Sequence, residues 1–270
     1  MSKRYDELGW PDIAALDKEK TIVMIPVGAT EQHGRHLPLG TDSFDAQYVA
    51  DQLIQTVEED FPLLVFPLLP VGLSVEHMRF PGSVTLQPDT LYHVALDICE
   101  SLVRHGFRRI VFLNGHGGNS SILNTVSYKI RSDYGVGVFL IDISVLLGLP
   151  NKPVQVRTEG FDSHAGELET ALVLAARPET VRMERAVPTR PERFEGNRLF
   201  TLEGPVSVGW LANDLSSAGN CGNPRYATAE QGQAMFRSMI SDACTALHEI
   251  QAWPLDIQMD PSLEPTAVQG

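Results

Sequence analysis

One short segment carries the side chains from which a metal site could be built. Glu31, His33 and Asp42 lie in the sequence GATEQHGRHLPLGTD at residues 28–42, directly after the apolar residues 21–27. Carboxylates and imidazoles that leave water lose several kcal/mol each unless something pairs with them. Because carboxylate oxygen and imidazole nitrogen are ligands for Zn, Mn or Fe, this segment predicts half of a metal site.

A second candidate follows another apolar run. The sequence NGHGGN at residues 114–119 places His116 just beyond an expected strand, with Gly117 and Gly118 able to approach a ligand closely. A lone His-Gly-Gly can equally form a tight turn or a phosphate-binding loop before a helix. Metal binding is favoured here because ligands of open α/β sheets bind beyond the carboxyl ends of the strands, where the first segment also ends.

A third polar cluster, HAGELETA at residues 164–171, begins an expected helix. The residues three and four positions from Glu169 are small or apolar, so its carboxylate is expected along a packed face, whereas Glu167 has a more polar flank. The simpler alternative is a solvated Glu167 and a slightly misplaced Glu169. We favour the hypothesis that Glu169 reaches the metal centre, with His164 nearby as an acid or base. Both are therefore candidate catalytic residues.

A charge count predicts two divalent ions per chain. Three carboxylates and two neutral imidazoles are available, from Glu31, Asp42, Glu169, His33 and His116. Two divalent ions and one bridging hydroxide bring this set to neutrality, and each ion has three protein ligands if Asp42 bridges. Paired ions of this kind polarise a carbonyl and generate hydroxide near neutral pH, which is hydrolytic chemistry.

Other candidates carry less weight. His36 is expected to orient its loop rather than to bind an ion. His77 and the neighbouring FPGS sequence at residues 80–83 are expected to form a wall of the substrate site, although a surface turn explains them nearly as well. Cys221 lacks an obvious base partner. Neither a serine nucleophile elbow nor a Walker loop nor a Rossmann fingerprint occurs in the sequence.

The elements that must position these residues alternate between strands and helices. Strands are expected at residues 22–27, 63–69, 110–113 and 136–143. Helices are expected after Thr41 and at about residues 89–105, 120–134, 166–176 and 227–253. This alternation predicts an α/β fold with a mostly parallel sheet covered on both faces. We expect one domain over residues 1–270, with residues 177–215 as an excursion or edge hairpin and about 255–270 as a surface tail.

Composition excludes several classes of partner. The net charge of −13 argues against nucleic acid or an anionic membrane, since both need a basic face. The three cysteines show no CxxC spacing, so a disulfide scaffold or a thiolate zinc site is not expected. No secretory leader and no run of 18 apolar residues occurs in the sequence, and a cytoplasmic protein is expected.

The chain resembles the creatininase family of metal-dependent amidohydrolases. The segments that carry the resemblance lie at residues 28–42, 76–86, 114–119, 164–171 and 222–232. The resemblance implies a three-layer α/β/α sandwich that assembles into homohexamers. It also implies that Glu31, Asp42 and His116 bind one ion, while His33 and Asp42 bind the second.

The sequence departs from the namesake enzymes at two positions. Creatininases carry a glutamate where this chain has Gly118, as the remaining ligand of the second ion, so either Glu169 substitutes or the second site is weak. They carry a tryptophan against the flat substrate where this chain has Gly160, with Phe161 beside it. Creatinine itself is therefore not expected as the substrate. We take His77, Gly117, Gly118 and Phe161 as candidate substrate contacts.

These observations predict a hydrolase that uses two divalent ions on a small polar substrate, first a cyclic amide or a formamide. The NGHGGN subgroup is similar to formamide hydrolases of deazaflavin biosynthesis, to the peptidase of mycofactocin maturation and to a hydrolase of an oxidised inositol, 3-dehydro-scyllo-inosose. Ring opening of such a cyclic ketone is the alternative reaction. A subunit that binds a metal or small ligand without catalysis is the alternative class.

Overall fold

The computed structural model describes residues 2–147, 162–200, 202, 205–206 and 208–256. Gly160, Phe161 and nearly all of the expected tail lie outside the described residues. The central sheet has four parallel strands in the order β2-β1-β3-β4. These strands are β1 (Ile22–Val27), β2 (Leu63–Val65), β3 (Arg109–Asn114) and β4 (Gly137–Asp142).

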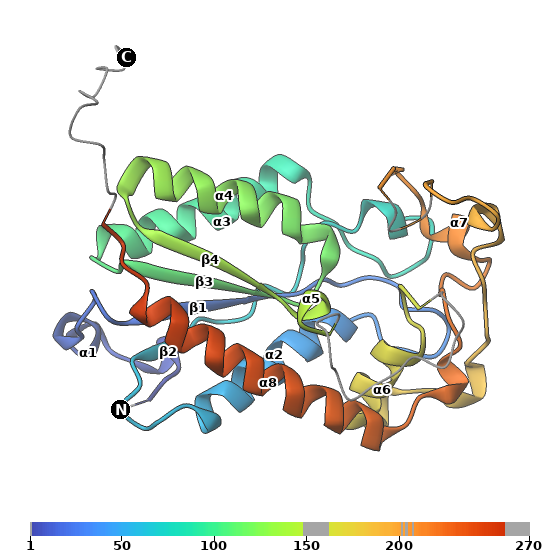
Figure 1. Ribbon diagram of the computed structural model, residues 1–270, viewed down its shortest axis with the longest axis horizontal. Helices are drawn as coiled ribbons and strands as arrows, with labels where there is room; N and C mark the ends of the chain where they lie inside the picture. The colour runs from blue at the N-terminus through green and yellow to red at the C-terminus, as the bar shows by residue number, and fades with distance from the viewer. Residues whose placement is uncertain (1, 148–161, 201, 203–204, 207, 257–270) are drawn as a thin grey trace, which may run out of the picture.

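Helices cover both faces of this sheet, which makes the fold the expected three-layer α/β/α sandwich (Figure 1). One face is covered by α3 (Pro88–Arg104) and α4 (Ser120–Tyr134). The other face is covered by α2 (Thr41–Thr56), α5 (Ile143–Leu147), α6 (Glu167–Ala176) and α8 (Ala229–Ala252).

The residues of β1 explain why two separate cores form. Val23 and Ile25 pack with the α3–α4 layer, whereas Ile22 and Met24 pack with the layer that contains α2 and α8. Because successive side chains of a strand point to opposite faces, a continuous apolar run supplies both cores at once. All six residues of β1 are buried. The sheet is thus fixed from both sides, and its strand ends are fixed with it.

The structure differs from the predicted elements at three places. β2 ends at Val65, well before residue 69. The N–H groups of Phe66 and Leu69 still donate to the carbonyls of Met24 and Pro26, but Pro26 of β1 has no N–H to donate in return. The short helix α1 (Trp10–Ala15), six residues long, was not predicted. Residues 177–215 are an excursion rather than an edge hairpin, since their described part contains short 3-10 turns and α7 (Ala212–Leu215) and adds no strand to the sheet.

Helices α6 and α8 lie unusually close together. A Cβ atom built on Gly232 of α8 would lie only 1.9 Å from the backbone oxygen of Ala171 in α6. Only glycine allows this approach, and the expected C-terminal helix thereby fixes the position of the helix that begins at the third polar cluster. Within the described residues, no helix is long and apolar enough to cross a membrane.

Candidate metal centre

The three polar clusters of the sequence meet at the carboxyl end of the sheet. Glu31 and His33 lie in the loop after β1, Asp42 lies in the first turn of α2, and His116 follows β3. All four side chains are buried. Glu169, in the first turn of α6, approaches the same place from the neighbouring layer.

Glu31, Asp42 and His116 form the first candidate group, which we call the strand-end group. Nδ1 of His116 lies 3.1 Å from Oδ2 of Asp42, and Nε2 of His116 lies 3.4 Å from Oε2 of Glu31. One ligand atom from each residue lies within 4.8 Å of the others. Two ligand atoms about 2.1 Å from one ion, at angles of about 90–110°, lie about 3.0–3.4 Å apart, so the separation between Nδ1 of His116 and Asp42 suits a shared cation, with Glu31 as the third member of the group.

His33 contacts both Asp42 and Glu169, and we call these three residues the helix group; ligand atoms of His33 and Glu169 also lie within 4.8 Å of one on His164. Nε2 of His33 lies 3.1 Å from Oδ1 of Asp42 and 3.7 Å from Oε2 of Glu169. The two oxygens of Asp42 therefore face two different imidazoles, His33 and His116. This is the arrangement that a carboxylate bridging two ions requires.

Backbone carbonyls orient three of the imidazoles. Nδ1 of His33 lies 3.2 Å from the Glu31 carbonyl oxygen, and Nε2 of His116 lies 2.5 Å from that of Leu73. Nε2 of His164 lies 2.9 Å from the carbonyl oxygen of Gln32. A carbonyl oxygen only accepts, so each neutral ring keeps its proton there and turns its unprotonated nitrogen toward the carboxylates. Metal-binding histidines are oriented in this way.

The carboxylates fit a bound cation because their own partners are incomplete. Both carboxylate oxygens of Glu31 and Oδ2 of Asp42 are buried and accept no hydrogen bond from any described residue. A buried carboxylate without hydrogen bonds is costly, and a divalent ion supplies the missing charge and coordination. The donor set of carboxylate oxygen and imidazole nitrogen suits Zn, Mn or Fe.

Three side chains of the centre have raised pKa values and hold protons at neutral pH. Burial raises the pKa of Glu31 to about 8, and the charge of Asp42 adds to this shift. Burial lowers the pKa of His116, but Glu31 and Asp42 outweigh it and raise that pKa to about 10. The same balance raises the pKa of His33, chiefly through Asp42. The ion-free centre is therefore neutralised by protons that a metal must displace.

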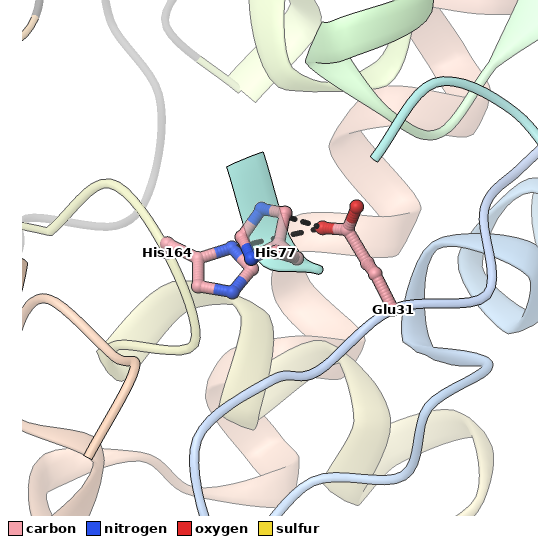
Figure 2. Close-up of side chains that lie close together, drawn as sticks. All are labelled: Glu31, His77 and His164. Atoms are coloured by element: carbon pink, nitrogen blue, oxygen red, sulfur yellow. Dashed lines mark ion pairs between the residues drawn. The ribbon is translucent and has the colours of Figure 1, made fainter. Parts of the chain in front are cut away.

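His77 and His164 meet the other side of Glu31 (Figure 2). Nε2 of His77 lies 3.3 Å from Oε1 of Glu31, and Nδ1 of His164 lies 4.0 Å from the same oxygen. Burial, with the nearby charge of His33, lowers the pKa of His77 to about 3 and lowers that of His164 well below its usual value. Both rings are thus neutral at neutral pH. His77, predicted as part of a substrate wall, lies inside the cluster.

The remaining predicted residues are placed as follows. Gly117 and Gly118 are exposed, and a Cβ atom at Gly118 would lie 2.4 Å from Nε2 of His116 and 2.8 Å from the Leu73 carbonyl oxygen, so a side chain at this position would require His116 or that backbone to move. Nε2 of His36 lies 2.9 Å from the hydroxyl of Thr170, in keeping with a loop-orienting role. Phe161 lies outside the described residues.

The two glutamates of α6 differ from expectation in their exposure: Glu167 is the more buried and Glu169 the more exposed. Glu167 is buried and accepts a hydrogen bond from Nε2 of Gln231 at 2.9 Å, so the alternative of a solvated Glu167 is wrong. The side chain of Glu169 is 30% exposed and accepts a hydrogen bond from the Ala165 N–H. The first turn of α6 bends Glu169 away from the packed face and toward His33.

Sequence reasoning missed several residues that build the centre. Asn119 bridges two loops, because its amide nitrogen donates to the Gly28 carbonyl at 3.1 Å and its oxygen accepts from the Leu73 N–H at 2.9 Å. The amide nitrogen of Gln32 lies 2.8 Å from Nδ1 of His77 and 3.1 Å from Nε2 of His164. The amide in NGHGGN and the glutamine between Glu31 and His33 were signals, since a buried amide needs specific partners.

Comparison with known proteins places nearly the whole chain in one family. The creatininase family model, described as creatinine amidohydrolase, matches residues 6–247. The mycofactocin precursor peptide peptidase of Mycobacterium tuberculosis (strain CDC 1551 / Oshkosh) is 32% identical over 244 residues, which cover 87% of this chain and 88% of that protein.

Two further proteins also match most of the chain. The creatinine amidohydrolase of Pseudomonas putida is 28% identical over 259 residues, which cover 90% of this chain and 95% of that protein. A mutant creatininase of the Zn-Zn type has a TM-score of 0.77 at 26% identity and covers 93% of this chain and 99% of that chain. The chain therefore belongs to the creatininase family of hydrolytic enzymes.

Proposed function

We propose that the protein is a hydrolase that needs two divalent metal ions and cleaves a carbon–nitrogen bond of a small polar substrate, first a cyclic amide or a formamide. The observation that carries the proposal is the pair of contacts made by Asp42, whose two oxygens face His33 and His116 at 3.1 Å each. The Zn-Zn form of a structural relative supports the two-ion assignment.

The ligand roles follow from the two groups. Glu31, Asp42 and His116 would hold one ion, and His33, Asp42 and Glu169 would hold the other. Bound there, divalent ions would polarise the substrate carbonyl and lower the pKa of water near neutrality. Zn, Mn and Fe all suit these donors.

The protein's own residues supply proton transfer. The Nδ1 atom of His164 is unprotonated and faces the cluster, so His164 can accept a proton from the attacking water and return it to the leaving nitrogen. Burial lowers its pKa well below the usual value, so the ring is neutral at neutral pH and its lone pair is available. The exposed edge of Glu169 lies on the same side and provides a second carboxylate for this step.

Hydrolysis of a peptide bond is the second candidate function. It is favoured by the likeness to the mycofactocin precursor peptide peptidase at 32% identity. The same side chains would serve, because attack on a peptide carbonyl needs the same polarisation and the same proton transfer to nitrogen. Creatinine stays an unexpected substrate because Gly118 and Gly160 stand where the resemblance places the glutamate and the tryptophan of the namesake enzymes.

Metal analysis and a substrate panel test the proposal. Purified protein, reconstituted with Zn, Mn or Fe, should hold about two ions per chain, and fewer than about one ion would contradict it. The metal-loaded protein should hydrolyse a cyclic amide or formamide in a panel that also holds short peptides, lactones and cyclic ketones. Turnover of cyclic ketones alone would favour the carbon–carbon alternative, and bound metal without turnover of any compound would favour a binding subunit.

Assembly into a homohexamer and residence in the cytoplasm stay predictions. Light scattering coupled to gel filtration measures the first, and fractionation of cells measures the second.

A further inference from the structure

Gln32 has a side-chain amide whose orientation the backbone fixes. The Gly34 N–H donates to Oε1 of Gln32 at 2.9 Å, and Nε2 of Gln32 donates to the Gly219 carbonyl at 3.0 Å. A backbone N–H can only donate and a carbonyl can only accept, so the two ends of the amide cannot be exchanged. The side chain is buried, and one amide hydrogen remains for a further partner.

That remaining hydrogen points to His77. Nε2 of Gln32 lies 2.8 Å from Nδ1 of His77, the shortest of the contacts that this amide nitrogen makes. The amide nitrogen has no lone pair to offer, so Nδ1 of a neutral His77 must accept, and the ring proton must sit on Nε2. Nε2 is the nitrogen that lies 3.3 Å from Oε1 of Glu31.

His164 carries its proton on the same ring nitrogen, Nε2, but turns its other nitrogen toward Glu31. Its Nε2 lies 3.1 Å from the amide nitrogen of Gln32 and 2.9 Å from the backbone oxygen of the same residue. Because both amide hydrogens already have partners, Nε2 of His164 carries the proton and donates it to the backbone oxygen. Nδ1 then keeps a free lone pair, directed toward Glu31 at 4.0 Å.

We propose that Gln32 is a positioning residue that gives the two neighbouring imidazoles the same tautomer, protonated at Nε2, but opposite orientations, so that His77 turns an N–H toward Glu31 and His164 turns a lone pair toward it. His77, although close enough to join a metal group with Glu31 and His164, therefore turns an N–H and not a lone pair toward Glu31, and it is not a ligand. His164 is left as the group able to accept a proton. The catalytic consequence rests on the proposed function, whereas the proton arrangement does not.

Nitrogen-15 NMR of histidine-labelled protein tests the arrangement directly, with the zinc-loaded protein and the protein as purified measured side by side. We expect His77 protonated at Nε2 with Nδ1 as an acceptor, and His164 protonated at Nε2. Gln32→Glu, which replaces only the donating NH₂ by oxygen, and Gln32→Met should shift the His77 signals to the other tautomer or a mixture. A wild-type His77 protonated at Nδ1, or tautomers unchanged in both variants, would overturn the inference.

Measurements of kcat and KM distinguish a positioning role of Gln32 from general damage to the structure. Both variants should lower kcat by about 10- to 100-fold with a smaller change in KM, since second-layer partners of metal-site histidines carry effects of this size. Gln47→Met is the matched control, because Gln47 donates to Asp51 on α2 at 2.8 Å, outside the cluster, and its loss should leave kcat and the NMR signals unchanged. If no substrate is hydrolysed, the proposed function fails while the NMR result still decides the inference.

Discussion

The strand-end group and the helix group share Asp42 but are built differently. Glu31 and His116 follow strands that two apolar layers fix, and both side chains are buried. Glu169 instead comes from the first turn of α6, and its side chain is 30% exposed. The Ala165 N–H that holds Glu169 belongs to a residue at φ 46°, in the left-handed region that L residues rarely adopt. Glu31 and His116 are preorganised by the sheet, whereas the position of Glu169 depends on a strained turn.

This difference predicts that the two groups bind their ions with unequal affinity. The strand-end group should bind its ion more tightly, because less ordering is needed when the ion arrives. The helix group should bind the weaker ion and should respond first to mutation or chelation. The following variants test this contrast, beginning with the one that removes both groups.

Asp42→Ala should have the largest effect, since each of its oxygens faces a different group. We expect metal content to fall from about two ions per chain to background, and hydrolysis with it. Elemental analysis by mass spectrometry measures the content. Asp51→Ala on the same helix is the control, because Asp51 pairs with Arg4 at 2.7 Å and should keep both ions. Retention of one ion in Asp42→Ala would show that this carboxylate does not bridge.

His33→Ala should remove only the ion of the helix group. Its Nε2 contacts Asp42 and Glu169, so the strand-end ligands keep their geometry and about one ion per chain should remain. His116→Ala should instead remove the tighter ion. The same metal analysis, with stepwise chelation, distinguishes the two variants. Equal losses from both would mean that the groups do not act separately.

Glu169→Gln should weaken one ion without abolishing it. The amide keeps one oxygen near His33 but loses the charge, so the weaker ion should lose at least about 10-fold in affinity while the tighter ion is unaffected. Competition with a chromophoric chelator resolves the two affinities. An equal loss of affinity for both ions would mean that Glu169 supports both groups, and it would contradict the difference drawn between them.

A change of pH should alter the metal affinity of both groups in the same direction, so it should produce the smallest difference between them. The pKa of His116 is raised to about 10 and that of Glu31 to about 8, so both hold protons at neutral pH and release them when an ion binds. Raising the pH therefore favours metal binding, by about tenfold per pH unit for each displaced proton. Chelator competition at about pH 6, 7 and 8 measures the slope. A flat response would contradict proton displacement.

The fold and the ligand types could be predicted from sequence because they depend on local pattern. Apolar runs gave β1 and β3, and polar residues directly after them had to lie at one edge of the sheet. His77 was harder to place, because it lies in a single 3-10 turn (Val75–His77) that has no periodicity. Gln32 could not be assigned a role, because its effect depends on Gly34, Gly219 and two imidazoles that only the folded chain brings together.

The close approach of Gly232 to Ala171 has a consequence for engineering. Glu169 lies two residues before Ala171 on α6, so the spacing between α6 and α8 sets how far Glu169 reaches toward His33. A larger residue at position 232 would have to push the two helices apart. If the proposed helix group binds an ion, position 232 therefore offers a way to adjust that site from a helix interface, without altering the residues proposed to react.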